Sequence, residues 1–259
     1  MMEGLIKHFK VDKLDVFIFE TRKQMGKAAY ELYRQEVIHT LETQTKIRAI
    51  FAAAHSQDDF FDCLAADNAI DFSRIEAFHM DEYVSLGKKA PQNFGNFLMN
   101  AIFSKKNFGA IHFIESEPAD VDAECRRYEA LLKSAPVDIV SLGIGENGHI
   151  AFNDPGEAKF DDPLWVKITA LDELCRQQQV NDGEFASLED VPKQALTLTI
   201  PALMSCRTVI GIVPSERKAE AIRNTLYGKI SEACPASVLR THDNASLFID
   251  KGATAMISP

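Results

Sequence analysis

Three side chains that can take part in proton transfer, those of Asn147, His149 and Asp154, lie close together within residues 142–155. The stretch reads LGIGENGHIAFNDP. A histidine held with an amide and a carboxylate provides the groups that general acid–base catalysis uses. A glycine-rich loop with one histidine is also compatible with an ordinary turn, so the surrounding elements must decide whether the loop carries a site.

The element in front of this loop favours a site. Residues 137–142 form a short apolar run, which is typical of a buried strand. Gly143, Gly145 and Gly148 then allow the backbone to turn tightly and to approach a ligand without an intervening Cβ. Open α/β sheets bind their ligands at the carboxyl ends of strands, where this loop is expected to lie.

A second group of polar residues follows another predicted strand. Asp81 and Glu82 come directly after residues 75–79, so we expect their carboxylates at the same edge of the sheet. An aldose–ketose interconversion needs a base that removes a proton beside a carbonyl, and burial against Phe78 and Tyr83 would raise a carboxyl pKa toward a useful value. Alone, the two acids could equally be solvated loop residues, but together with the histidine loop they favour catalysis.

Strand-like and helix-like segments alternate along the chain. Apolar runs predict strands at 14–19, 47–53, 75–79, 111–114, 137–142, 165–169, 195–200, 208–213 and 246–250. Helical periodicity occupies 21–42, 58–66, 93–103, 120–132, 172–179 and 215–226, with Thr21 placed as an N-cap. This alternation predicts a three-layer α/β fold with a mostly parallel, doubly wound sheet and helices on both faces.

No repeat, low-complexity segment or proline-rich linker divides the chain, so residues 1–259 are expected to form one domain. The polar span 177–193, which contains Asn181-Asp182-Gly183, is the strongest loop candidate. We therefore expect a lid at about residues 160–192.

Composition narrows the class of partner. With 28 basic and 38 acidic residues the net charge is −10, which argues against nucleic acid and leaves an anionic substrate dependent on helix N-termini and a few local cations. No run approaches the ~18 apolar residues of a membrane span, and residues 1–10 lack the pattern of a signal peptide. Five scattered cysteines without a C-x-x-C pair argue against a zinc cluster or disulfide framework and predict a cytoplasmic location.

The segment MDEY at residues 80–83 and the stretch 142–155 together resemble the glucosamine-6-phosphate deaminase (isomerase) family, within the wider sugar-phosphate isomerase and 6-phosphogluconolactonase superfamily. The resemblance implies that His149, with Asn147 and Asp154, opens the sugar ring and that Asp81 takes the proton from C2. The family acid at position 154 is usually Glu. Because Asp154 is one methylene shorter, we expect it to need a compensating shift to reach His149.

The resemblance is looser where the family binds phosphate. Residues 52–58 read AAAHSQD, without the glycines that let backbone amides approach an anion. Ser56 keeps a hydroxyl donor, His55 reads as an ordinary surface histidine, and Asp58 would oppose a doubly charged ligand.

The family also uses a lid arginine and a late lysine. Gln179 occupies the position of that arginine, Arg176 is the candidate replacement, and Lys218 is the best phosphate ligand. The expected substrate-binding residues are Ser56, Glu82, Gly145, Gly148, Arg176, Gln179 and Lys218.

We therefore expect an aldose–ketose isomerase/deaminase that acts on a phosphorylated aminosugar, transfers a proton from C2 to C1 and releases ammonia, with no metal or organic cofactor. A small phosphorylated sugar is the expected partner, and a homo-oligomer stays open. Two alternatives remain: a 6-phosphogluconolactonase-like hydrolase and a non-catalytic sugar-phosphate sensor. Residues 80–83 and 152–155 favour the isomerase branch.

Overall fold

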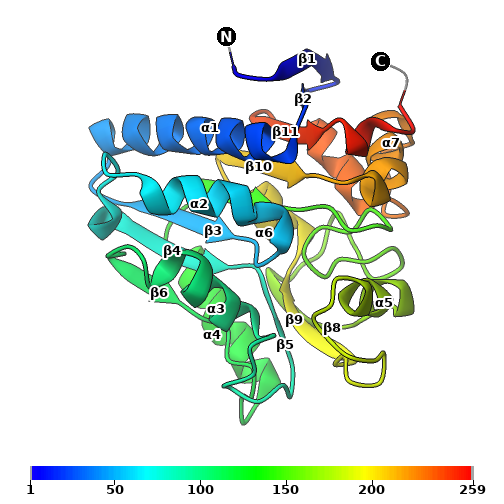
Figure 1. The fold of residues 1–259 in the computed structure, drawn as a ribbon. Coiled ribbons are helices and arrows are strands. Elements are labelled where there is room, and N and C mark those ends of the chain that lie inside the picture. Colours follow the sequence, from blue (N-terminus) through cyan, green and yellow to red (C-terminus); the bar gives the residue numbers. More distant parts are fainter. Residues whose placement is uncertain (1, 258–259) are drawn as a thin grey trace.

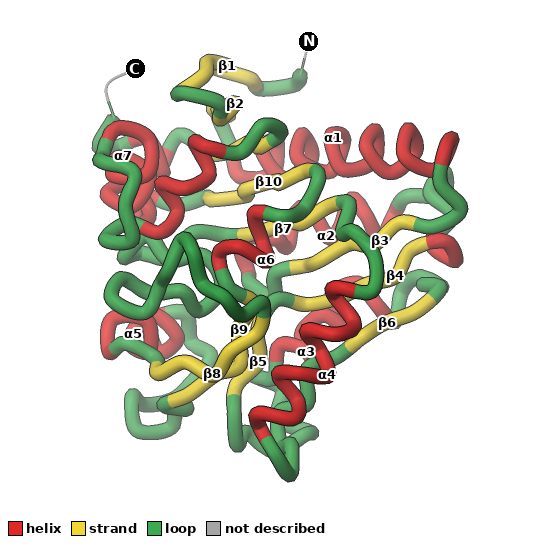
Figure 2. The backbone as a smooth tube through the Cα atoms, turned by 180° about the vertical axis from the view of Figure 1, so that it is seen from behind, coloured by secondary structure: helices red, strands yellow, loops and turns green. Residues whose placement is uncertain are grey.

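The computed structural model describes residues 2–257 and is built on an eight-stranded sheet with helices on both faces (Figures 1 and 2). The strand order is β1-β2-β11-β10-β7-β3-β4-β6, and every pair is parallel except the β1–β2 hairpin. The strands are β1 (Leu5–Val11), β2 (Leu14–Phe19), β3 (Ile47–Phe51), β4 (Ile75–His79), β6 (Ala110–His112), β7 (Ile139–Leu142), β10 (Thr208–Val213) and β11 (Ala245–Asp250). The predicted fold class is confirmed.

Alternation along the strands divides the core into two layers. In β10, Val209 and Val213 pack on one face of the sheet, whereas Ile210 and Ile212 pack on the other. One face is covered by α1 (Arg22–Thr43), α2 (Asp58–Ala66) and α3 (Phe94–Leu98). The opposite face is covered by α4 (Val121–Lys133), α6 (Ile200–Met204) and α7 (Ala219–Tyr227). None of the helices in residues 2–257 combines the length and the apolar character needed to cross a bilayer.

The strand order also fixes where a ligand can bind. From β3 the chain proceeds outward to β4 and β6, then returns to β7 beside β3 and proceeds the other way to β10 and β11. The sheet therefore changes direction between β3 and β7, and such a switch point leaves a crevice at the carboxyl ends of the strands. The loops after these two strands are the ones that carry Ser56 and His149.

A second, three-stranded sheet lies beside the first, with the order β5-β9-β8 (Figure 1). Its strands are β5 (Asp81–Tyr83), β8 (Val166–Ala170) and β9 (Gln194–Leu198), and both pairings are antiparallel. The helix α5 (Glu173–Asn181) lies between β8 and β9 in the chain. The expected lid therefore begins and ends near two strands of this small sheet.

Most predicted elements match the structure to within a few residues, and Thr21 does accept a bond from the backbone N–H of Gln24 as the N-cap of α1. The strands β1 and β5 and the helix α6 were not predicted. The helix expected at 93–103 is α3 followed by a π-helical turn at Met99–Phe103.

Candidate active site

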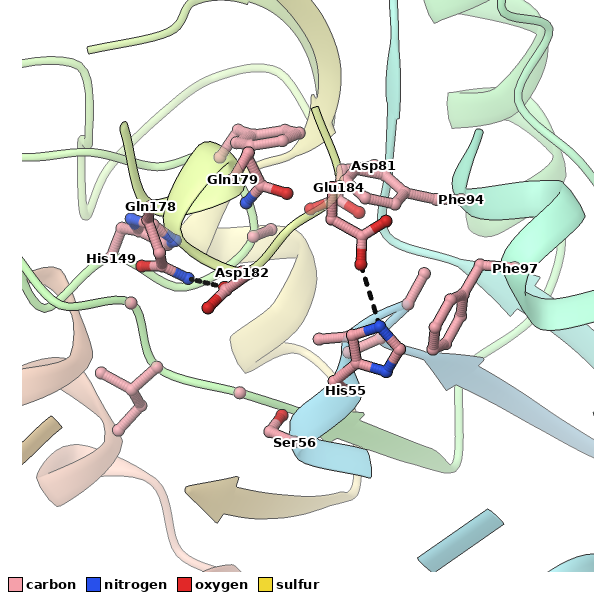
Figure 3. A pocket seen from close by; sticks show the side chains of 18 of the residues that line it. His55, Ser56, Asp81, Phe94, Phe97, His149, Gln178, Gln179, Asp182 and Glu184 are labelled. Carbon is pink, nitrogen blue, oxygen red and sulfur yellow. Dashed lines mark hydrogen bonds and ion pairs between the residues drawn. The ribbon is translucent and has the colours of Figure 1, made fainter. Parts of the chain in front are cut away.

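A cavity of about 280 Å³ lies at the carboxyl ends of β3, β4, β7 and β10 (Figure 3). It is lined by the loops that follow these strands and by α5 with the turn after it. Six of the residues expected from the sequence line it: Ser56, Asp81, Gly145, His149, Gln179 and Lys218. The other five do not line it: Glu82, Asn147, Gly148, Asp154 and Arg176.

His149 is held by the two neighbours that the sequence assigned to it. Its Nδ1 lies 2.8 Å from Oδ1 of Asp154, and its backbone N–H donates to Oδ1 of Asn147 at 3.0 Å. The Asn147 amide in turn donates to Asp154 at 2.9 Å. The three residues therefore form one connected group, with only the imidazole on the cavity wall.

The expectation that the shorter Asp154 needs a compensating shift is answered by the backbone between the two residues. Ala151 has a left-handed φ of 49°, and Ile150 and Asn153 pair across a tight turn. The Asn153 amide also donates to the carbonyls of Ile150 and Leu198. With this turn between the two residues, Asp154 lies within ion-pair distance of His149 although its side chain is one methylene shorter than that of Glu.

Two glycines in the loop are required by this arrangement. A Cβ on Gly145 would lie 2.2 Å from Cε1 of His149, so the imidazole can pack there only against a glycine. Gly148 has a φ of +87°, a conformation that other residues rarely adopt. Gly145 thus lines the cavity directly, whereas Gly148 shapes the loop from behind.

The charge state of Asp154 suits an orienting role. Its side chain is completely buried, which by itself would raise the pKa. The contacts from His149 and Asn147 outweigh burial, so the pKa of Asp154 lies below its ordinary value. Asp154 therefore stays an acceptor that fixes the ring orientation.

Asp81 reaches the cavity as the first residue of β5, immediately after β4. Its register partner in β9 is Thr197, so the position of its backbone is fixed by sheet hydrogen bonds. Burial, and secondarily the charge of Glu82, raises the pKa of Asp81 well above the ordinary value. A carboxylate with a raised pKa is a stronger base than an exposed one, as carbon deprotonation requires.

Glu82 points away from the cavity, as the alternation along a strand requires. Its carboxylate accepts bonds from the backbone N–H groups of Tyr83, Phe94 and Gly95 at 2.9 to 3.0 Å. Burial raises the pKa of Glu82 to about 7, although these three donors act in the opposite direction. The structure thus gives Glu82 a role at the start of α3 in place of the expected substrate contact.

The opposite end of the cavity is formed by two short 3₁₀ turns, His55–Gln57 after β3 and Glu216–Lys218 after β10. Ser56 presents its hydroxyl beside Gly143. Burial lowers the pKa of Lys218, which has no ion-pair partner among residues 2–257. Lys218 is therefore a cation that can accept an anionic ligand without breaking an existing pair.

Sequence reasoning missed a second basic residue at this end. Arg22, at the start of α1, lines the cavity and pairs with Asp59 at 2.8 Å and with Asp58 at 3.2 Å. It therefore offsets the carboxylate of Asp58, which was expected to oppose an anion. No local pattern could have revealed this pairing, because the partners are 36 residues or more apart in the chain.

On the lid, Gln179 lines the cavity but Arg176 does not replace the missing arginine there. The Arg176 guanidinium instead donates to the backbone carbonyls of Leu188 and Val191, 3.1 Å away in the second case. Arg176 thus holds the loop after α5 to the helix. The expectation that it contacts substrate is corrected in favour of this internal role.

One group of side chains within residues 2–257 offers metal-ligand atoms at short range. The donor atoms of His149, Asp154 and Cys175 all lie within 4.8 Å of one another. Nitrogen, oxygen and sulfur donors of these types suit a soft divalent cation. Asp154 and His149 already face each other at 2.8 Å, so these two side chains are paired with one another.

Fold and site together define an α/β enzyme whose acid–base groups meet at the switch point of a parallel sheet. Residues 20–248 match the family described as glucosamine-6-phosphate isomerases/6-phosphogluconolactonase. Because this match covers most of the chain, the protein belongs to that family.

The relatives agree with this assignment. The chain is 34% identical over 245 residues to the glucosamine-6-phosphate deaminase of Bacillus thuringiensis (strain Al Hakam), a match that covers 95% of this chain and 90% of the relative. The solved structure of a monomeric glucosamine-6-phosphate deaminase has a TM-score of 0.86 at 29% identity, over 93% of this chain and 99% of that one. A 6-phosphogluconolactonase from Trypanosoma brucei shares the fold, with a TM-score of 0.77 at 16% identity over 97% of this chain and all of the other.

Proposed function

We propose that this enzyme converts a phosphorylated 2-amino-aldose into the corresponding ketose phosphate and ammonia. The observation that carries the proposal is that Asp81, His149 and Lys218 line the same cavity, with Lys218 at the end away from Asp81. A base, a ring-opening group and an anion-binding cation are the three functions this reaction needs. The relatives named as glucosamine-6-phosphate deaminases add support.

In the first step, His149 moves a proton between the anomeric hydroxyl and the ring oxygen, so that the pyranose opens to the aldehyde. Asp154 and Asn147 keep the imidazole in the orientation that this transfer requires. Neither of these two residues touches the cavity, so both act through His149.

In the second step, Asp81 removes the proton from C2, which the neighbouring aldehyde makes acidic. The aldehyde oxygen takes up a proton from the C2 ammonium group, and an enolamine forms. The same carboxyl then returns the proton to C1, which leaves an imine at C2. Water adds to this imine, and ammonia leaves as the C2 ketone forms. One carboxyl can serve both carbons because the proton is held, not released, in a buried site.

The phosphate is assigned to the end of the cavity formed by the turns after β3 and β10, where Ser56 donates a hydroxyl hydrogen bond and Lys218 supplies positive charge. Gln179, from the lid, contributes an amide. We also propose that residues 1–259 form a single domain and that residues at about 160–192 form a lid over the cavity. Five free cysteines within residues 2–257 support a reducing, cytoplasmic location.

The experiment is an assay for ammonia, coupled to glutamate dehydrogenase, across the 6-phosphates of glucosamine, galactosamine and mannosamine and the unphosphorylated sugars. We expect release from at least one phosphorylated aminosugar and far slower release from its unphosphorylated form. A parallel pH-stat trace with 6-phosphogluconolactone tests the lactonase alternative. Thermal stabilisation by the phosphosugars without ammonia release would instead identify a sensor.

A further inference from the structure

The basic residues that line the cavity differ in their ion-pair partners. Lys218 is unpaired within residues 2–257, and Arg22 is paired with the helix α2 through Asp58 and Asp59. Arg217, which lines the cavity beside Lys218 in sequence, is paired with Asp182. This last pair is unlike the others, because its carboxylate comes from the lid.

Two lid carboxylates reach across to the anion end. Asp182 pairs with Arg217, whose Nε also lies 3.6 Å from Oε1 of Glu146. Glu184 pairs with His55, with 2.9 Å between Oε1 and Nε2, as Figure 3 shows. Both carboxylates line the cavity. The turn after α5 thus places two carboxylates against Arg217 and His55, which line the cavity at the end proposed for the phosphate.

These contacts can be exchanged at small energetic cost. About half of the Arg217 side chain is exposed, and ion pairs in such a position are weak because water screens them. A phosphate group offers a guanidinium two charged oxygens in a planar, bidentate arrangement that is stronger than a solvated carboxylate contact. A phosphate held by Lys218 would therefore compete successfully with Asp182 for Arg217.

We propose that Arg217 is a further specificity-determining residue, a phosphate ligand that Asp182 neutralises until the phosphorylated substrate arrives. This inference rests on the proposed function, because it takes the substrate to be phosphorylated. On binding, Arg217 exchanges Asp182 for the phosphate, and the turn after α5 loses a contact with the turn after β10. A neutral sugar cannot make this exchange, so the pair selects for the anion.

The test combines two single variants and their double variant. Arg217→Gln removes the proposed ligand, Asp182→Asn removes its competitor, and the double variant removes both. Glu189→Gln is the matched control, since Glu189 is an exposed acid of the same loop and the change alters net charge by the same amount. The measurements are KM and kcat with glucosamine 6-phosphate and, separately, the dissociation constant of inorganic phosphate by calorimetry.

We expect Arg217→Gln to raise both the dissociation constant of phosphate and KM by about 10-fold or more, with little change in kcat. This is the scale of one charge-assisted hydrogen bond. Asp182→Asn should lower both constants by about 2- to 5-fold, which is the scale of an exposed ion pair. In the double variant the Asp182 change should have no further effect, because its partner is gone. Glu189→Gln should match the unaltered protein.

The inference is overturned if Arg217→Gln binds inorganic phosphate as the unaltered protein does, or if Asp182→Asn gives the same gain in the presence and absence of Arg217. It is also overturned if Glu189→Gln reproduces the gain, which would then be a bulk charge effect. The phosphate measurement does not need turnover. An enzyme that releases no ammonia but shows this Arg217 dependence would refute the proposed reaction and retain the inference, whereas active enzyme without the dependence would do the reverse.

Discussion

The two ends of the cavity are built on different principles. At the end proposed for proton transfer, Asp81 and His149 lie on the wall with less than a tenth of each exposed, and Asp154, which contacts His149, is fully buried. At the end proposed for the phosphate, Lys218 is unpaired within residues 2–257, whereas partly exposed Arg217 pairs with Asp182 of the lid, and His55 with Glu184. The first end is fixed by the parallel sheet and its loops. The second end depends on contacts that a ligand can replace.

This difference teaches what each end must do. Proton transfer to and from carbon requires reacting groups held within a fraction of an ångström, so a buried and mutually bonded set is favoured. Anion binding requires charge that the incoming group can neutralise, so solvated pairs serve adequately. Substitutions at the first end should therefore alter kcat, and those at the second end should alter KM.

The largest expected effect belongs to Asp81. Asp81→Asn keeps the size of the side chain but removes the base, so turnover should fall by about 10²- to 10⁴-fold. The circular dichroism spectrum should stay unchanged. Near-normal ammonia release from a folded variant would remove Asp81 from the mechanism.

Asp154→Asn tests whether the buried residues behind the wall act through orientation. The neutral amide cannot stabilise a charged imidazole and competes for its hydrogen-bonding position, so kcat should fall by about 10²-fold with KM almost unchanged. The decisive readout is the split between kcat and KM. An equal rise in KM would place Asp154 among the groups that bind substrate.

Lys218→Met should give the opposite split. Removal of the unpaired cation loses one charge-assisted interaction with the phosphate, so KM should rise by about 10- to 100-fold while kcat changes little. Lys229→Met, at an exposed lysine away from the cavity, controls for net charge. A loss confined to kcat would contradict the division between the two ends.

The smallest effect concerns stability. The pKa of Glu82 is raised from 4.5 to about 7 by burial, so the folded state binds its proton more tightly than the unfolded state does. The contribution of Glu82 to the free energy of unfolding is therefore largest below about pH 4.5, and it is lost as the pH rises through 7. The melting temperature should fall by about 2–4 °C per pH unit between pH 5 and 7.

Glu82→Gln removes this titration, so its melting temperature should vary less with pH over the same interval, even though the lost acceptor lowers it throughout. Differential scanning fluorimetry at pH 5, 6, 7 and 8 provides the comparison. An unchanged slope in the variant would show that Glu82 titrates normally.

Sequence patterns predicted the parallel sheet and the convergence of Asp81 and His149 on its edge, because each residue lies just after, or in the loop after, an apolar run typical of a buried strand. The anion end was predicted less well. Its defining contacts, from Arg22 to Asp59 and from Arg217 to Asp182, join segments far apart in the chain, and exposed charges carry no periodic signal. Tertiary packing alone decides which of them meet.

Two residues illustrate the limit of alignment by position. Arg176 has the right charge one helical turn from Gln179, yet the helix directs it toward the carbonyls of Leu188 and Val191. Asp154 is one methylene shorter than Glu, yet it lies 2.8 Å from Nδ1 of His149, in a loop where Ala151 is left-handed. In both cases the position of the backbone helps to decide which groups meet.

The small antiparallel sheet has a consequence for how this enzyme can be altered. β8 and β9 are paired along their whole length, and just beyond them the Leu171 amide donates to the Lys193 carbonyl at 2.9 Å. The excursion between them, residues 172–192, therefore begins and ends at adjacent, hydrogen-bonded positions. The excursion also packs on the site, because Phe185 contacts Tyr83 edge to face and both Gln179 and Asp182 line the cavity. Changes of length or charge in its exposed turns should therefore alter contacts to the substrate, while the pairing of β5 with β9 continues to place Asp81 against Thr197.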